Sequence, residues 1–252
     1  KNNLFIIKMR VLLSIIVLSI LLIQCKPKPI EKPSKIVGLV ADSAMVVSAR
    51  GEASKIGVEI LKKGGNAFDA MIATELALAV AYPFAGNIGG GGFMVYRTND
   101  GKTGALDYRE KAPLAASKNM YLDKNGDIIE GKSILGAMAI GIPGTVDGLF
   151  KVHEKFGTLP FSELIQPAID LAYKGVIVTK NQENRLARYR QYFTEVNDTI
   201  IIFDAEWKEN DTIKYPKLAK SLERIRDNGR DGFYKGETAE MLVNYVQKLG
   251  GI

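Results

Sequence analysis

The most apolar segment of the chain is Ala67–Tyr82, in which apolar side chains occupy almost every face of a helical repeat. Only Asp69, Thr74 and Glu75 interrupt it. A helix that is apolar on nearly every face has to be buried, so this segment predicts a helix in the middle of the domain. Pro83 ends it, because proline has no N–H and cannot continue the helical hydrogen bonds.

Shorter patterns predict the remaining elements. The β-branched run Ala44–Ala49 is typical of a buried strand, and two segments separated by the turn "TNDGKTG", Phe93–Arg97 and Ala105–Tyr108, predict a hairpin. Apolar residues at helical spacing predict further helices at Ser54–Lys63, Val146–Phe156, Phe161–Lys174, Lys180–Tyr192, Tyr215–Asn228 and Glu237–Leu249. Because strands come first and helices dominate later, the chain belongs to a mixed α/β (α+β) class.

Four consecutive glycines, Gly89–Gly92, lie between the apolar helix and the first strand of the hairpin. A phosphate-binding loop requires the order strand, glycines, helix, whereas the order here is helix, glycines, strand. No Gly-Lys-Ser/Thr follows, and Met94 breaks the G-x-G-x-x-G pattern. We therefore expect the glycines to allow close backbone packing or positive φ angles where the helix leads into the strand.

The N-terminal segment has the pattern of an export signal. Met9 is the first methionine, Arg10 supplies positive charge, and the apolar run Val11–Ile23 is shorter than the roughly 20 residues of a membrane-spanning helix. Cys25 follows this run and resembles the lipidated cysteine of a bacterial lipobox, although Gln24 replaces the usual small residue. An ordinary signal peptide with an incidental cysteine is the alternative.

These patterns divide the N-terminal part of the chain into a signal peptide over residues 1–24 and a lipidated cysteine with a Pro/Lys-rich tether over 25–36. The expected location is the periplasm or the cell surface, with the protein attached to the membrane through a lipid. Cys25 is the only cysteine, so no internal disulfide is possible.

The net charge of +6 comes entirely from this N-terminal part. Of 34 basic and 28 acidic residues, seven basic and one acidic residue precede Ile36, which leaves 27 of each sign in the rest of the chain. A neutral domain lacks the basic surface that nucleic-acid binding requires, so this class of partner is excluded.

Few residues suggest catalytic chemistry. His153 is the only histidine and lies among charged residues of a predicted helix, where a solvated surface residue is expected; no metal-ligand cluster is visible. Arg109 directly follows a predicted strand and is flanked by Asp107 and Glu110. Such an arginine can bind a substrate carboxylate through paired N–H donors, but from the spacing alone an ordinary surface ion pair is favoured.

Several long motifs, in order, resemble the large subunit of the γ-glutamyltransferases (γ-glutamyltranspeptidases). From about Met45 to the chain end, they read "GGNAFDAMIATELALAVAYPFAGNIGGGGFMVYR", "LDYREKAP", "GIPGTVDGL", "KFGTLPFSELIQPAIDLAYKGVIV" and "GFYKGETAE". The resemblance implies the αββα sandwich of N-terminal-nucleophile hydrolases. It also implies a precursor that cleaves itself into a large and a small subunit, and on this reading residues 37–252 are a partial large subunit.

The family's activity follows from the same resemblance. Its members cleave the γ-glutamyl amide of glutathione and related compounds, and transfer the γ-glutamyl group to water, amino acids or peptides. The nucleophile is the N-terminal threonine of the small subunit, whose α-amine serves as base, so no cofactor or metal is implied.

The motifs place Arg109 at the α-carboxylate of the γ-glutamyl substrate, with Asp107 and Glu110 as residues that orient it. The nucleophilic threonine is expected downstream of Ile252, since Thr158, Thr179 and Thr238 have no recognisable processing context. We therefore expect this chain by itself to be inactive, to expose apolar surface and to dissolve poorly.

Two other functions are compatible with the sequence. One is a related amide-cleaving enzyme of the same superfamily, a β-lactam side-chain acylase or a capsule-processing transpeptidase. The other is a binding lipoprotein that kept the scaffold and lost the nucleophile.

Overall fold

The computed structural model describes residues 38–198 and 201–252. The chain divides into two units, Lys1–Asp42 and Ser43–Ile252, and all the described helices and strands lie in the second. The predicted signal peptide, Cys25 and the tether fall outside the described residues. Among the described helices, none is long and apolar enough to cross a bilayer.

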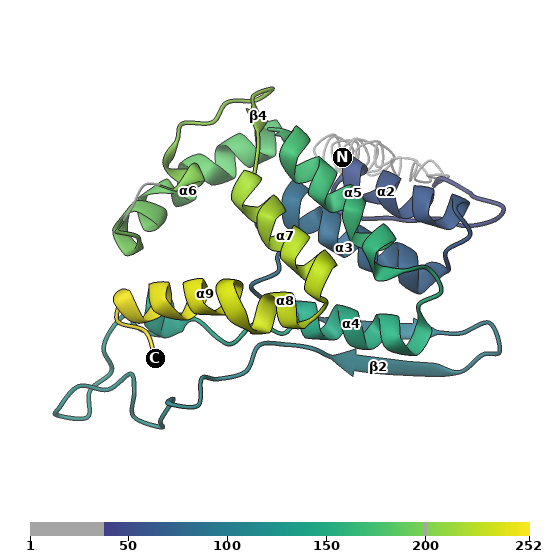
Figure 1. Cartoon of the computed structure of the whole chain (residues 1–252). Helices are drawn as coiled ribbons and strands as arrows, with labels where there is room; N and C mark the ends of the chain where they lie inside the picture. The colour runs from purple at the N-terminus through teal and green to yellow at the C-terminus, as the bar shows by residue number, and fades with distance from the viewer. Residues whose placement is uncertain (1–37, 199–200) are drawn as a thin grey trace, which may run out of the picture. The chain divides into compact units, whose positions relative to one another are not determined.

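Helix α3 (Ala67–Ala81) forms the centre of the second unit, as its apolar pattern predicts (Figure 1). Ten of its residues are buried, and it packs against α2 (Gly51–Lys62) and α5 (Phe161–Lys174). Helix α7 (Pro216–Asn228) in turn packs on α5. The core between these helices is almost entirely aliphatic; its largest fully buried side chains include Ile60, Ile72, Leu76, Leu164, Ile165, Ile169, Leu222 and Ile225.

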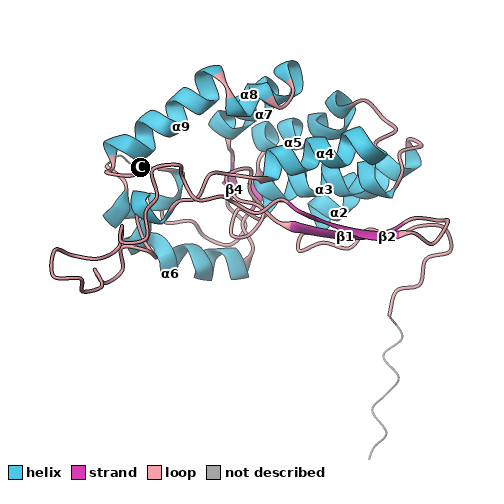
Figure 2. Cartoon of the chain, turned by 90° about the horizontal axis from the view of Figure 1, so that it is seen from below, coloured by secondary structure: helices cyan, strands magenta, loops and turns pink. Residues whose placement is uncertain are grey.

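The predicted hairpin is confirmed. Strand β1 (Phe93–Arg97) pairs antiparallel with β2 (Thr103–Asp107), with Phe93 opposite Asp107. The hairpin lies along the helices of the second unit (Figure 2). Met94 is buried in the core, whereas Phe93 and Val95 point to the opposite face and are 65% and 83% exposed.

The prediction of a strand at Ala44–Ala49 is wrong. This segment has no strand conformation, and Val47 is 82% exposed. A β-branched run forms a strand only when a neighbouring strand accepts its backbone hydrogen bonds, and the described residues offer it none. The described strands form two separate two-stranded sheets, β1–β2 and β3–β4. Strands β3 (Val176–Ile177) and β4 (Thr212–Ile213) were not predicted from the sequence. The mixed helix and strand class is confirmed, while stacked sheets are not formed among the described residues.

Three further helices agree with their predicted positions to within a few residues: α4 (Thr145–Phe156), α6 (Lys180–Val196) and α9 (Gly236–Lys248). The short helix α8 (Asp231–Tyr234) and the 3₁₀ helices at Ala137–Ala139 and Ile202–Asp204 were not predicted. Between residues 110 and 142 the chain is largely irregular, and Leu114, Ile128 and Ile134 are exposed there. The expected exposure of apolar surface is therefore present.

His153 is not the solvated surface residue that its charged neighbours suggest. Its side chain is half-buried in α4, its Nε2 is 2.8 Å from the carbonyl oxygen of Leu159, and its ring meets the Phe161 ring edge-on. The histidine therefore joins the end of α4 to the start of α5. The sequence pattern did not predict these contacts of His153, because they depend on how the loop between α4 and α5 folds back.

Asp69 is fully buried at the start of α3 and joins this helix to the end of α4. Its carboxylate accepts hydrogen bonds from the backbone N–H of Asn66 (2.9 Å) and from both the N–H and the hydroxyl of Thr158. Asn66 caps the same helix and donates from Nδ2 to the Phe156 carbonyl oxygen at 2.6 Å. A capping box thus also fixes a contact between two helices.

Asp69→Ala should destabilise the fold by about 3 kcal/mol, because it leaves several buried donors without an acceptor. We expect a fall in the melting temperature of the full-length protein of roughly 2–3 °C. Asp123→Ala, in an exposed turn, is the matched control and should change it little. Equal effects of the two substitutions would contradict this role of Asp69.

Candidate functional site

Arg109 lies just beyond the end of β2, and its side chain is exposed. Its guanidinium carbon is 5.7 Å from the centre of the Phe93 ring, within the range of a cation–π contact. The described residues give it no ion pair: Asp107 accepts a hydrogen bond from the backbone N–H of Arg109 at 2.9 Å, and Glu110 makes no hydrogen bond. The surface ion pair that the spacing favours is therefore absent from the described residues, and the guanidinium is available to an anion.

Asp107 and Glu110 thus differ in their contacts with Arg109. The Asp107 carboxylate fixes the backbone of Arg109 rather than its guanidinium. Glu110 is exposed, and no described contact joins it to Arg109. That the two residues orient the arginine during substrate binding stays a prediction.

Tyr108 anchors the segment after β2 to the core, on the face opposite to Arg109. Its ring is buried, and its hydroxyl donates to the carboxylate of Glu75 on α3, with oxygen–oxygen distances of 3.1 and 3.4 Å. Burial raises the pKa of Glu75, and the hydrogen bond from Tyr108 opposes this. Burial and the nearby carboxylate both raise the pKa of Tyr108. The pair therefore joins the strand end before Arg109 to the central helix.

The glycines make room for this arrangement. A Cβ atom at Gly92 would lie 2.9 Å from the Tyr108 ring, and one at Gly91 would lie 2.6 Å from the Cα of Arg109. In the "GIPG" segment, a Cβ at Gly144 would overlap the carbonyl oxygen of Tyr108. These distances confirm close packing at Gly91 and Gly92, whereas a Cβ atom at Gly89 would have open space. None of the four glycines from Gly89 to Gly92 has a positive φ, so that alternative is wrong.

Backbone hydrogen bonds complete the contact between the two glycine segments. The Gly90 carbonyl oxygen accepts from the N–H groups of Gly144 (2.7 Å) and Thr145 (3.0 Å), at the start of α4. A carbonyl oxygen therefore occupies the helix N-terminus that a phosphate would need. This geometry agrees with the prediction that Gly89–Gly92 do not form a phosphate-binding loop.

Tyr234 on α8 is a supporting residue that the sequence did not reveal. Its hydroxyl donates to the Pro143 carbonyl oxygen (2.8 Å) and accepts from the backbone N–H of Asp147 (3.2 Å). Arg230 pairs with the Asp147 carboxylate and lies over the Tyr234 ring. The "GFYKGE" and "GIPG" motifs are thus in contact, but nothing in their spacing indicates it, because 87 residues separate Asp147 from Tyr234.

The threonines considered as nucleophiles all have structural partners. The Thr158 hydroxyl donates to Asp69, Thr179 caps α6, and the Thr238 hydroxyl accepts from Arg224 at 2.7 Å. The described residues also contain no group of three His, Cys, Asp or Glu side chains that could bind a metal ion. Binding of an anion by Arg109 therefore stays a prediction, with which its exposed guanidinium is compatible.

Known proteins are similar to this chain in both sequence and structure. The "Glutathione hydrolase proenzyme" of Pseudomonas sp. (strain A14) is 47% identical over 216 residues, which cover 84% of this chain and 38% of that relative. The γ-glutamyltranspeptidase structure from Helicobacter pylori matches with a TM-score of 0.82 at 40% identity, over 86% of this chain and 63% of that one. The enzyme from Pseudomonas nitroreducens, complexed with L-DON, matches with a TM-score of 0.78 at 47% identity, over 84% and 63%.

Other amide-processing enzymes match less closely. The Bacillus anthracis transpeptidase CapD is 28% identical with a TM-score of 0.66, and a cephalosporin acylase from Bacillus halodurans is 26% identical with a TM-score of 0.75. The matches therefore do not favour the acylase or capsule-transpeptidase alternatives.

The family model described as γ-glutamyltranspeptidase matches residues 53–252. The described residues accordingly form part of the αββα fold of the N-terminal-nucleophile hydrolases. The chain spans about 38% of the length of the curated relative from Pseudomonas sp.. With a family match over most of its length and a shared fold, the chain belongs to the γ-glutamyltranspeptidase family.

Proposed function

We propose that this chain is part of the large subunit of a glutathione hydrolase. The full-length protein would cleave the γ-glutamyl amide of glutathione and related compounds, and pass the γ-glutamyl group to water, amino acids or peptides. The curated relatives named glutathione hydrolase proenzyme support this proposal. The observation that carries it is Arg109, whose guanidinium has no ion pair among the described residues and lies at a rigidly packed strand end.

In this proposal, Arg109 binds the substrate's α-carboxylate through two parallel N–H donors. Its position would fix the γ-amide carbonyl against the nucleophile, since a substrate bound at one end by a bidentate contact has few orientations left. The threonine hydroxyl would attack that carbonyl, and the released amine would take the proton that the threonine's α-amine had accepted. Water or an acceptor amine would then release the γ-glutamyl group from its ester with the enzyme.

The nucleophile is proposed to lie downstream of Ile252, in a small subunit produced by self-cleavage. Two observations support this. The curated relatives are considerably longer than this chain, and the threonines considered above have structural roles. The small subunit would then be this chain's permanent partner, and the exposed apolar faces of β1 and of the irregular segment after Arg109 are suited to such packing.

The N-terminal pattern supports an exported protein. Residues 1–24 would be the signal peptide, Cys25 the lipidated residue, and residues 25–36 a tether that carries the domain from the membrane into the periplasm or to the cell surface. Residues 37–252 would then be the large-subunit domain.

Arg109→Ala should lower kcat/KM of the full-length enzyme for a γ-glutamyl anilide by roughly 100-fold, because a bidentate charged contact is lost. The kcat/KM of Arg109→Lys should lie between those of the unaltered enzyme and of Arg109→Ala, since an ammonium keeps the charge but cannot replace the paired donors. The control Arg97→Ala, at an exposed position of β1, should leave kcat/KM unchanged.

A substrate without the α-carboxylate distinguishes carboxylate binding from a general defect. The corresponding γ-aminobutyryl anilide should react poorly with the unaltered enzyme and lose little more in Arg109→Ala. If both substrates lose the same factor, Arg109 does not bind the carboxylate and the proposed role is wrong.

The mature N-terminus should begin at Cys25 and carry covalent lipid, as measured by mass spectrometry of the protein purified from membranes. Cys25→Ser should yield a protein without lipid that is no longer retained with the membrane. A mature N-terminus at another residue, without lipid, would refute the anchoring proposal.

A further inference from the structure

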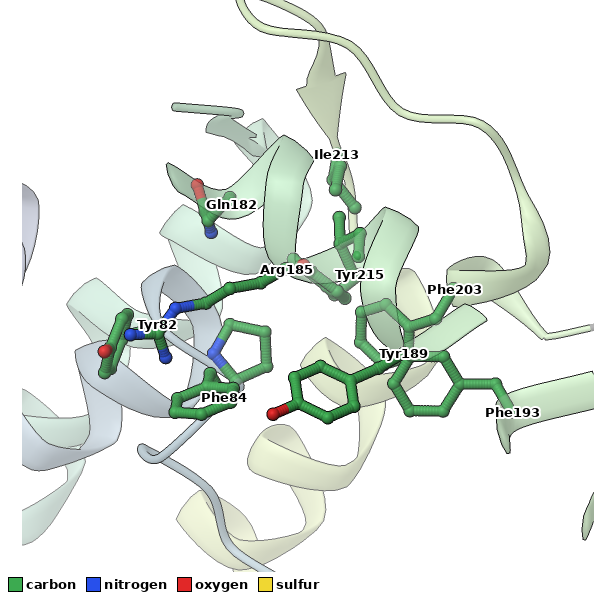
Figure 3. Close-up of a pocket in the computed structure, with 11 residues that line it drawn as sticks. Tyr82, Phe84, Gln182, Arg185, Tyr189, Phe193, Phe203, Ile213 and Tyr215 are labelled. Atoms are coloured by element: carbon green, nitrogen blue, oxygen red, sulfur yellow. The ribbon is translucent and has the colours of Figure 1, made fainter. Parts of the chain in front are cut away.

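A pocket lies between the end of α3, helix α6 and strand β4 (Figure 3). Its volume is about 120 Å³, similar to an engineered cavity of roughly 150 Å³ that accommodates benzene. Aromatic side chains form most of its wall: Tyr82, Phe84, Tyr189, Phe193, Phe203 and Tyr215. The pocket therefore has room and suitable chemistry for one aromatic ring.

Arg185 is the only charged residue among the described residues that line the pocket. Its guanidinium carbon lies 3.8 Å from the centre of the Phe84 ring and 5.9 Å from that of Tyr82. The Nη1 atom is buried and has no hydrogen-bond partner in the described part of the chain. The residue as a whole is half-buried, so the unfavourable group is this one N–H group without an acceptor, and an anion in the pocket could supply that acceptor.

Tyr215 provides a second open polar group. Its side chain is 7% exposed, and its hydroxyl has no hydrogen-bond partner among the described residues. Burial raises its pKa to about 12, so at neutral pH the hydroxyl keeps its proton and can donate it. Figure 3 shows Tyr215 beside the side-chain stem of Arg185.

The side-chain amide of Gln182, which also lines the pocket, already has hydrogen-bond partners. Its Oε1 accepts from Arg50 Nη1 at 2.5 Å, and its Nε2 donates to the Ala81 carbonyl oxygen at 3.2 Å. Two buried donors without a partner therefore remain among the described lining residues, one charged and one neutral.

We propose that this pocket binds a small carboxylic acid with one aromatic ring, an arylalkanoate. The ring would lie among the aromatic side chains, and the carboxylate would accept hydrogen bonds from Arg185 and Tyr215. A neutral apolar ligand would leave the guanidinium uncompensated, and an inorganic anion would leave the apolar wall unfilled. Arg109 is not among the lining residues, so this binding is independent of the proposed γ-glutamyl chemistry.

The first test is isothermal titration of 3-phenylpropionate into the full-length protein. Arg185→Gln should raise Kd by roughly tenfold or more, and Tyr215→Phe by roughly threefold to tenfold, because each loses a buried donor. Arg188→Gln, exposed on the same helix and outside the lining, is the matched control and should leave Kd unchanged. Arg109→Ala should also leave Kd unchanged, which separates this proposal from the previous one.

A ligand series tests the same proposal without any variant. The neutral 3-phenylpropionamide should bind roughly tenfold more weakly than the acid, and propionate should show no measurable binding. L-Phenylalanine should bind more weakly than 3-phenylpropionate, since no carboxylate of the described lining can pair with its ammonium group.

Three results would overturn the proposal. They are the same Kd for acid and amide, the same Kd for Arg185→Gln and Arg188→Gln, or no binding of 3-phenylpropionate at millimolar concentration. A crystal structure of the full-length protein with another part of its own chain in the pocket would overturn it as well.

Discussion

The contact between the Tyr108 ring and the glycines around it is the constraint on which the candidate site depends. Gly92 leaves the ring space on one side, and Gly144 lets the "GIPG" segment approach the backbone of Tyr108. The ring can then reach Glu75 on the central helix. Because neighbouring side chains of an extended segment point in opposite directions, burial of Tyr108 directs Arg109 outward. The residue before Arg109 thus sets the side of the segment on which this candidate binding residue lies.

Several of these features could be predicted from the sequence, and each has a local cause. The central helix followed from apolar residues on nearly every face of Ala67–Tyr82, and the hairpin from two short β-rich segments around a glycine turn. Close packing at the glycines followed from the order of the elements around them. The position of Arg109 after a strand made it a candidate, but its spacing to Asp107 and Glu110 favoured an ion pair that the described residues do not form. Only the family resemblance favoured a binding role for it.

What the sequence could not predict depends on contacts between distant segments. The Ala44–Ala49 run lacks a neighbouring strand in the described part of the chain, so its β propensity was misleading. The support of the "GIPG" segment by Tyr234 joins residues that are 91 positions apart. Likewise, the aromatic pocket around Arg185 combines side chains from the end of α3, from α6 and from β4, and no single segment shows that pattern.

The most direct measurement of the central contact is a double-mutant cycle of Gly92→Ala and Tyr108→Leu in the full-length protein, by the free energy of unfolding. Gly92→Ala should cost about 1–3 kcal/mol, because its methyl group would meet the tip of a buried, hydrogen-bonded ring. In the Tyr108→Leu background the same change should cost much less, since leucine lacks the three ring atoms nearest to that methyl group. Gly89→Ala, with open space around its Cβ, should cost little in both. An equal cost of Gly92→Ala in both backgrounds would contradict the account.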